Sequence, residues 1–251
     1  MTDATTPVPN PPADPMIRSA LYRLLALGFK YPTRETFASF KDGDYLAELK
    51  EAASRLPYLG RFVEELEPVA RKVREDLRGA SFTAFEVKYV STFDVGFPEP
   101  PCPPYQGLYL DRERAKLMVE IAEMYKAFGL AVSQAEDRRE LPDYLPALLE
   151  LMHFLTFKEA QARQEGHPEL LEGYVHAQKD FLERHLAGWL PAFAEKVGKQ
   201  RDLAFFPELA TITARFAAAE LELVSSMHPA LAAARPPDLA PAVDEAPRAS
   251  A

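Results

Sequence analysis

Two residues, Glu150 and His153, have types and spacing that could support metal chemistry. They lie three positions apart in a segment of helical periodicity, so both side chains fall on one flank of a helix. Di-iron carboxylate bundles use this Glu-x-x-His pattern, but they need a second copy and further glutamates from neighbouring helices. The chain has no second Glu-x-x-His. A helical, di-iron-like metal enzyme therefore remains an alternative function, and a partly buried histidine bonded to a neighbour is the simpler interpretation.

Nucleophilic and nucleotide chemistry have no support in the sequence. Cys102 is the single cysteine, and it lies among four prolines with no His or Asn near it. One cysteine excludes an internal disulfide, a thiolate zinc site and a cysteine-ligated iron–sulfur cluster. The chain has no Gly-x-Ser-x-Gly and no glycine-rich phosphate loop. We therefore expect no catalytic residue, no metal and no cofactor, and we expect a protein that binds a partner.

The charge balance narrows the class of partner. The 251 residues carry 38 acidic and 29 basic side chains, which gives a net charge of −9. Nucleic-acid binding needs clustered Lys and Arg, so this charge argues against such a partner and permits a basic one. No uncharged apolar run approaches the roughly 20 residues that a membrane helix needs. Residues 1–15 lack the basic and apolar parts of a secretory signal, which indicates a cytoplasmic protein.

Helical periodicity extends over almost the whole chain between two proline-rich ends. Asp14 followed by Pro15 is typical of a helix start, because aspartate caps the free N–H groups and proline fits the first turn. The pattern predicts an all-α fold, a single-domain bundle of about nine helices over residues 16–228. Residues 1–15 and 229–251 are expected to be disordered tails, since neither can bury enough apolar surface to order itself.

The helical pattern fails from residue 95 to residue 108, which contains five prolines and two glycines. Proline removes a backbone donor and restricts the residue before it, so we predict a long proline-rich loop. An aromatic stripe at helical spacing precedes this loop and consists of Phe82, Phe85, Tyr89 and Phe93. A helix ending at Gly129 follows it, and then a polar connection at 131–140. The run Leu141-Pro142-Asp143 is predicted to open a long helix.

Three segments, in order, resemble a known family. They are Phe85-Glu86-Val87-Lys88-Tyr89-Val90-Ser91-Thr92-Phe93, the segment from Pro100 to Tyr109, and Glu140-Leu141-Pro142-Asp143-Tyr144-Leu145. They are similar to motifs of the maturation chaperones of molybdenum oxidoreductases, which include the trimethylamine oxide and dimethyl sulfoxide reductase chaperones and the nitrate reductase delta subunit. Within this family, the loop most resembles the chaperones of type II dimethyl-sulfoxide-reductase-family enzymes. That branch serves selenate, chlorate, dimethyl sulfide and ethylbenzene oxidoreductases.

The resemblance has two departures and two simpler explanations. Glu86 lies three residues before Tyr89 where the family has four, and Tyr144 replaces a histidine that is usual in the family. Thr83-x-x-Glu86 is also the pattern of a capping box. Pro142 and Asp143 are also the residues that any helix N-terminus favours.

The resemblance implies a chaperone and not an enzyme. Its partner would be the precursor of a catalytic molybdenum subunit, held in the cytoplasm, in many relatives through a twin-arginine leader, until the molybdenum cofactor is inserted. Asp143 and Glu140 are the first candidates for binding the two arginines, and Asp94 and Glu99 the second. The other candidate client-binding residues are Tyr105, Tyr109, Tyr144, Phe97, Pro142, Glu86 and Tyr89. A permanent structural subunit is an alternative, and a monomer and a domain-swapped dimer with a hinge at 131–140 both remain open.

Overall fold

The computed structural model describes residues 13–130, 140–200 and 204–234. Within these residues it has ten α-helices and no β-strand. The predicted all-α fold is confirmed. The helices are α1 (Pro15–Phe29), α2 (Arg34–Asp42), α3 (Asp44–Ser54), α4 (Gly60–Leu77), α5 (Phe82–Phe93), α6 (Arg114–Ala127), α7 (Leu145–Glu165), α8 (Pro168–Phe181), α9 (Leu190–Gly198) and α10 (Phe205–Ala234). Short 3₁₀ turns occupy Pro57–Leu59 and Gln106–Leu108, and Leu182–Leu186 is a π-helix.

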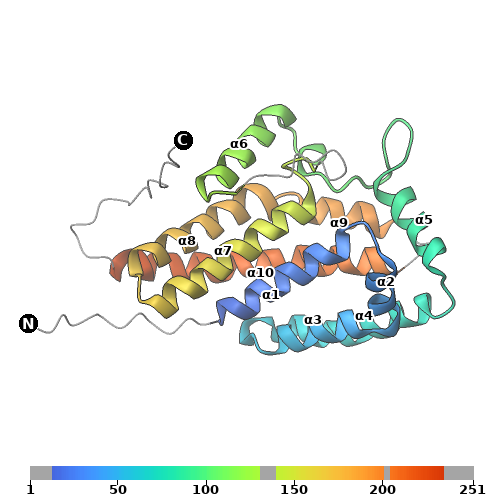
Figure 1. Ribbon diagram of the computed structural model, residues 1–251, viewed down its shortest axis with the longest axis horizontal. Helices are drawn as coiled ribbons and strands as arrows, with labels where there is room; N and C mark the ends of the chain where they lie inside the picture. The colour runs from blue at the N-terminus through green and yellow to red at the C-terminus, as the bar shows by residue number, and fades with distance from the viewer. Residues whose placement is uncertain (1–12, 131–139, 201–203, 235–251) are drawn as a thin grey trace, which may run out of the picture.

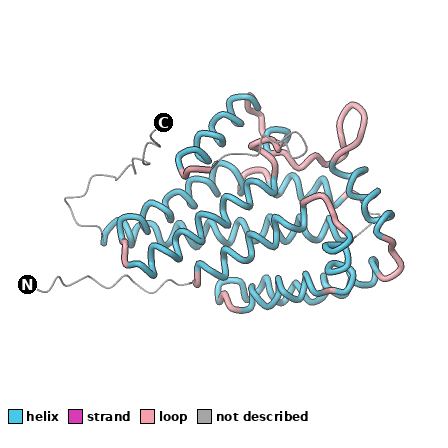
Figure 2. Tube along the Cα trace, viewed as in Figure 1, coloured by secondary structure: helices cyan, strands magenta, loops and turns pink. Residues whose placement is uncertain are grey.

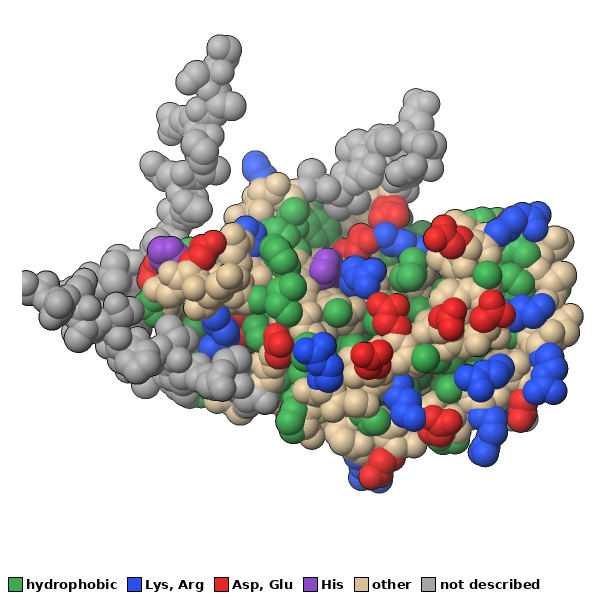
Figure 3. Space-filling view, turned by 60° about the horizontal axis from the view of Figure 1, so that its bottom comes forward, with side chains coloured by type: hydrophobic (Ala, Val, Ile, Leu, Met, Phe, Trp, Pro, Cys, Tyr) green, Lys and Arg blue, Asp and Glu red, His purple; other side chains and the backbone are tan. Residues whose placement is uncertain are grey.

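Four long helices form the body of the molecule. α1 packs along α7, α7 along α8, and α8 along α10, as Figures 1 and 2 show. α3 and α4 lie against each other below α1, while α6 lies apart on the opposite side. The face below α1 comes forward in Figure 3, where acidic and basic side chains are interspersed. Among the helices described, none combines the length and the apolarity needed to cross a membrane.

Local sequence signals explain several helix ends. Asp14 caps α1 by accepting a hydrogen bond from the Met16 amide at 2.8 Å, and Pro15 is its first residue, as predicted. Gly43, with a φ of 92°, ends α2 and directly precedes α3. This left-handed conformation favours glycine, and it lets two helices meet with a single residue between them. The split of residues 34–54 into two helices explains why ten are found where about nine were expected.

The predicted aromatic stripe lies in the core. Phe85, Tyr89 and Phe93 of α5 are buried, and Phe206 at the start of α10 contacts all three rings. The Phe85–Phe206 and Phe93–Phe206 ring centroids are each 5.1 Å apart. The Phe85–Phe206 rings are tilted at 36° and the Phe93–Phe206 rings meet edge to face, and aromatic pairs at such distances stabilise a core beyond the apolar area that they bury. The stripe therefore attaches α5, and with it the loop that follows, to the main bundle.

A buried ionic cluster lies at the centre of the four long helices. Arg18 of α1 is fully buried and donates to both carboxylate oxygens of Glu220 on α10, with a shortest N–O distance of 2.9 Å. It also donates to Glu159 of α7 at 2.7 Å and to the side-chain oxygen of Gln178 on α8 at 2.6 Å. Each of the four helices contributes one side chain, so the cluster fixes their mutual register.

Two further residues complete the hydrogen bonds of this cluster. Tyr58 donates to Glu220, and Arg163 donates to Glu159 at 3.0 Å. Two arginines therefore face two glutamates, and the charges balance. Burial alone lowers the pKa of Arg18, but Glu220 and Glu159 outweigh it, and the pKa lies well above its ordinary value. Arg18 thus remains charged in an interior where an unpaired charge would be very costly.

Three expected boundaries differ from the structure or fall outside it. α7 begins at Leu145, with Tyr144 as its N-cap residue, and not at Leu141-Pro142-Asp143 as predicted. α10 continues through the exposed Pro229 to Ala234, past the expected domain end at 228. Most of the two predicted tails, and all but the last residue of the expected hinge at 131–140, lie outside the described residues.

Removal of one partner from the ionic cluster should destabilise the fold strongly. Glu220→Ala leaves Arg18 buried with less negative charge around it, and the free energy of unfolding should fall by about 3–5 kcal/mol. Chemical denaturation followed by circular dichroism measures this change. Glu222→Ala, on the exposed side of the same helix, is the matched control and should change stability by less than about 0.5 kcal/mol. Equal losses in the two variants would contradict the assigned role.

Candidate functional site

The proline-rich loop and the segment before α7 are joined by backbone hydrogen bonds. The amide of Leu145 donates to the carbonyl of Pro104, and the amide of Gln106 donates to the carbonyl of Asp143, each at 2.9 Å. Tyr105 and Tyr144 form an isolated antiparallel bridge between the two segments. These contacts lie at the end of the bundle where α1 ends and where the loop leaves α5 (Figure 1). The structure thus brings together all three segments that carry the resemblance.

Four tyrosines, here named the tyrosine cluster, occupy this junction: Tyr31, Tyr89, Tyr105 and Tyr144. Tyr89 donates to the carbonyl of Phe29 at 2.9 Å, and its hydroxyl is 3.3 Å from that of Tyr144. The ring centroids of Tyr31 and Tyr89, and those of Tyr105 and Tyr144, are 5.4 Å apart. Burial raises the pKa of Tyr89, Tyr105 and Tyr144 above the ordinary tyrosine value. Their hydroxyls therefore stay neutral.

Exposure varies across the tyrosine cluster. Tyr89 is only 2% exposed, whereas Tyr31 is 52% exposed, so the cluster continues from the core to the surface. Nearby segments add three large apolar side chains that are open to solvent, Val87 of α5, Val95 of the loop and Leu141 before α7. An aromatic surface with apolar neighbours can bind the apolar part of a peptide.

Three carboxylates, here named the acidic rim, border the tyrosine cluster: Glu86, Asp94 and Glu140. Glu86 accepts a hydrogen bond from the Tyr31 hydroxyl at 2.9 Å. Asp94 and Glu140 are close enough to affect the pKa of Tyr105 and Tyr144. In the part of the chain that the structure describes, none of the three carboxylates forms an ion pair with Lys or Arg. The rim therefore offers negative charge that an external cation can neutralise.

Partial burial changes the pKa of two of the rim carboxyls, Asp94 and Glu140. Burial raises the pKa of Asp94 above the ordinary range of an aspartate. Burial also raises the pKa of Glu140, where Glu150 adds to the effect and Lys30 opposes it. A cation bound at either carboxyl would reverse this shift by favouring the ionised form.

Asp143 differs from the sequence-based expectation. Its side chain is fully buried and forms a two-point ion pair with Arg114, with Nε–Oδ2 and Nη2–Oδ1 distances of 2.7 and 3.1 Å. The Gly107 amide donates to the same Oδ2 at 3.2 Å. The prediction that Asp143 lies in the first turn of a helix is wrong, because Asp143 lies in a separate turn, closed by a 3.1 Å hydrogen bond from the Tyr144 amide to the Leu141 carbonyl, and α7 begins only at Leu145. The carboxylate neutralises an arginine and not a helix end.

The ion pair between Arg114 and Asp143 fits only because Gly107 has no side chain. A Cβ atom added to Gly107 would lie 2.4 Å from Cγ of Arg114 and 3.0 Å from Oδ2 of Asp143. Any other residue type would therefore push Arg114 away from the carboxylate. The guanidinium carbon of Arg114 also lies 5.1 Å from the ring centroid of Tyr105, a cation–π distance. The carboxylate and the aromatic face together form a guanidinium-binding site, and the Gly107 amide holds the carboxylate in place.

Other predicted site residues lie outside this arrangement. Tyr109 is half-buried against Trp189 and Phe193, with ring centroids 5.3 and 5.7 Å away, so it packs with the core. Phe97 is fully exposed in the loop, and Glu99 is 3.8 Å from Lys196.

Two backbone details also differ from what the sequence suggests. Pro142 lies before α7, which begins at Leu145, and not in its first turn, and its carbonyl accepts a hydrogen bond from the Tyr125 hydroxyl. The alternative that Glu86 completes a capping box with Thr83 is wrong, because Ser81 caps α5.

Glu150 and His153 have separate partners. Glu150 pairs with Lys30, and Nδ1 of His153 lies 2.7 Å from the Ser19 hydroxyl. The residues described contain no group of three or more His, Cys, Asp or Glu arranged to hold a metal ion. Cys102 is buried in the loop, and burial raises the pKa of its thiol, which disfavours the reactive thiolate.

The residues of the π-helix that hold the proline-rich loop in place through Gln106 were not identified from the sequence. The side-chain amide of Gln106 donates to the carbonyl of Arg184 at 2.8 Å, and its oxygen is 3.2 Å from Nδ1 of His185. His185 lies in the π-helix, and burial, helped by Arg184 and Arg112, lowers its pKa to about 4. A neutral histidine at neutral pH therefore holds the turn at Gln106 in place. No short motif marks these residues.

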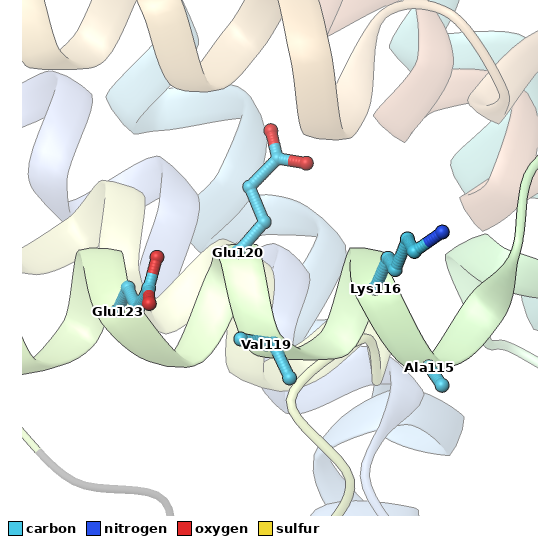
Figure 4. Close-up of a pocket in the computed structure, with 5 residues that line it drawn as sticks. All are labelled: Ala115, Lys116, Val119, Glu120 and Glu123. Atoms are coloured by element: carbon cyan, nitrogen blue, oxygen red, sulfur yellow. The ribbon is translucent and has the colours of Figure 1, made fainter.

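A further hollow lies along α6, and Figure 4 labels the five residues of this helix that line it. The hollow has a volume of about 310 Å³ and is lined by Ala115, Lys116, Val119, Glu120 and Glu123. Glu120 is already bound to Arg112 and Arg184. The hollow is mostly apolar and open, and it has no link to the acidic rim.

Comparison with known proteins identifies relatives. The family model described as "Nitrate reductase delta subunit" matches residues 45–195. The perchlorate reductase assembly chaperone protein of Dechloromonas aromatica is 36% identical over 209 residues, which cover 82% of this chain and 89% of that protein. The dimethyl sulfide dehydrogenase assembly chaperone protein of Rhodovulum sulfidophilum is 29% identical over 182 residues, covering 70% of this chain and 67% of that protein.

A further relative extends the same pattern. The selenate reductase assembly chaperone protein of Thauera selenatis is 34% identical over 113 residues, covering 45% of this chain and 56% of that protein. Selenate and dimethyl sulfide oxidoreductases are clients of the branch that the loop resembles, so the prediction of this branch is confirmed. The family match covers more than half of the chain, and it spans α5, the proline-rich loop and the start of α7. This chain is therefore a member of the nitrate reductase delta subunit family.

Proposed function

We propose that this chain is an assembly chaperone, not an enzyme, for the catalytic molybdenum subunit of a type II dimethyl-sulfoxide-reductase-family oxidoreductase. It holds the subunit precursor through its twin-arginine leader and delays export until the molybdenum cofactor is inserted. The observation that carries the proposal is the tyrosine cluster bordered by the acidic rim, at the junction of the three family segments. The names of the relatives, all assembly chaperones, support the same function.

The chemistry of such a leader suits this surface. A twin-arginine leader has two adjacent arginines followed by an apolar stretch. Arginine pairs with carboxylates in a geometry that provides two hydrogen bonds. Apolar side chains can pack on the exposed parts of the tyrosine cluster and on Val87, Val95 and Leu141. Charge and apolar surface are thus available side by side.

The open carboxylates are the first binding partners for the leader. Asp143 is occupied by Arg114, whereas Glu86, Asp94 and Glu140 have no such partner among the described residues. We therefore assign the first leader arginine to the acidic rim, with Glu140 and Asp94 as its main carboxylates. A cytoplasmic location belongs to this proposal, since a leader is bound before export.

Calorimetric titration tests the proposal directly. The full chain is titrated with synthetic leaders from the molybdoenzymes encoded beside its gene. Saturable binding is expected, and replacing both leader arginines by glutamine should weaken it at least about tenfold, a loss of about 1.4 kcal/mol. Equal affinity for the two peptides would overturn leader recognition through arginine. Co-purification with the mature enzyme, instead of the cofactor-free precursor, would favour a permanent structural subunit.

Neutralising the acidic rim should weaken binding without unfolding the protein. Glu140→Gln combined with Asp94→Asn removes two carboxylates that have no ion-pair partner, and affinity for the leader should fall about tenfold. Glu64→Gln combined with Glu75→Gln removes the same charge from the exposed side of α4 and is the matched control. Calorimetry gives both affinities. If both double variants lose affinity equally, net charge explains the effect and the site assignment is wrong.

Leader binding should also depend on pH. The pKa values of Glu140 and Asp94 are raised, so these groups gain protons earlier than ordinary carboxyls as the pH falls. A protonated carboxyl cannot form an ion pair with arginine, so affinity should be constant near pH 8 and fall as the pH approaches 5, by less than the loss caused by the double substitution. Titrations at several pH values measure this. The Glu140→Gln, Asp94→Asn double variant should show a flatter profile, and an equally steep one would contradict the assignment.

A further inference from the structure

Asp143 and its surroundings already hold a guanidinium group, and that group belongs to the chain itself. Arg114 meets both oxygens of the carboxylate and lies over the ring of Tyr105. Tyr105 also belongs to the tyrosine cluster. The charges of Asp94, Asp143 and Glu140 add to burial in raising the pKa of its hydroxyl. The guanidinium site and the acidic rim are therefore two parts of one surface, one filled and one open.

We infer that Arg114 is a resident competitor for this second guanidinium site, and that one arginine of a bound leader replaces it at Asp143. This inference rests on the proposed function, because it concerns how the same surface receives a peptide with two arginines. One leader arginine pairs with the acidic rim, and the other takes over the two-point pair with Asp143. The displaced Arg114 side chain then turns to solvent.

The position of Arg114 permits this exchange. It is the first residue of α6, and its side chain is 30% exposed while that of Asp143 is fully buried. α6 is anchored further along by the buried Leu117, Ile121 and Tyr125, so its first side chain can turn outward while the helix stays in place. Gly107 leaves room beside the carboxylate for any guanidinium that approaches.

The exchange also sets the strength of binding. Removing Arg114 without a substitute would leave a buried carboxylate unpaired, which is very unfavourable. An incoming guanidinium restores the same ion pair, so little net free energy is gained at this position. Only molecules in which Arg114 has left the site can bind the leader there, so the apparent affinity is the intrinsic affinity multiplied by the fraction of such molecules. A chaperone that must release its client benefits from such a limit.

Replacing Arg114 tests the inference. Arg114→Gln removes the competitor, and affinity for the twin-arginine leader should rise about tenfold in calorimetric titration. Lys116→Gln removes the same charge from an exposed position two residues along α6, and its affinity should stay within about twofold of the wild type. Adding Asp143→Asn to Arg114→Gln should abolish the gain. A folded Arg114→Gln variant whose affinity equals that of Lys116→Gln overturns the inference.

A second measurement covers the case in which the variant does not fold. In the unaltered chain, the Nε–H signal of Arg114 in a ¹⁵N-resolved NMR spectrum should move to a solvent-exchanging position when the leader saturates the protein. The signal is assigned through its loss in Arg114→Lys. Leader binding that leaves this signal unchanged overturns the exchange while the proposed function stands. Failure of any form to bind a leader overturns the proposed function, and this inference with it.

Discussion

The buried charge of Arg18 is the constraint on which the rest of the fold depends. A guanidinium in an apolar interior is tolerated only where carboxylates and acceptors surround it in good geometry. Here those partners come from α7, α8 and α10, between 141 and 202 residues away in sequence. The four helices must therefore all be present and in register before the charge is satisfied. Apolar packing drives the helices together, and the ionic cluster selects one way of doing so.

The end of the bundle that carries the tyrosine cluster is held differently. The loop reaches the segment before α7 through a few backbone hydrogen bonds, one two-point ion pair and stacked aromatic rings. Such contacts can be exchanged for similar contacts from another chain, whereas interdigitated core side chains cannot. A rigid bundle thus presents a surface whose polar bonds are replaceable. This division suits a protein that binds a partner and later lets it go.

Features set by neighbouring residues were predictable from the sequence, and features set by the tertiary fold were not. The Asp14-Pro15 helix start and the aromatic stripe of α5 follow from local spacing, and both are confirmed. The client-binding role expected of Asp143 stays a prediction, and its ion-pair partner Arg114 lies 29 residues away, so no local pattern reveals the pair. Tyr31 joins the tyrosine cluster only because α1 ends beside α5. The role of the acidic rim in client binding stays a prediction.

The π-helix at Leu182–Leu186 has a consequence for comparing this chain with its relatives. The amide of Ala187 bonds to the carbonyl of Leu182, five residues back, so this turn holds one more residue than an α-helical turn. Deletion of one residue here would restore a regular helix and rotate everything after it by about 100°. Trp189, whose indole N–H donates to the carbonyl of His185, would then face away from Tyr109. A one-residue gap in this stretch of an alignment would therefore mark relatives whose proline-rich loop rests on a different support.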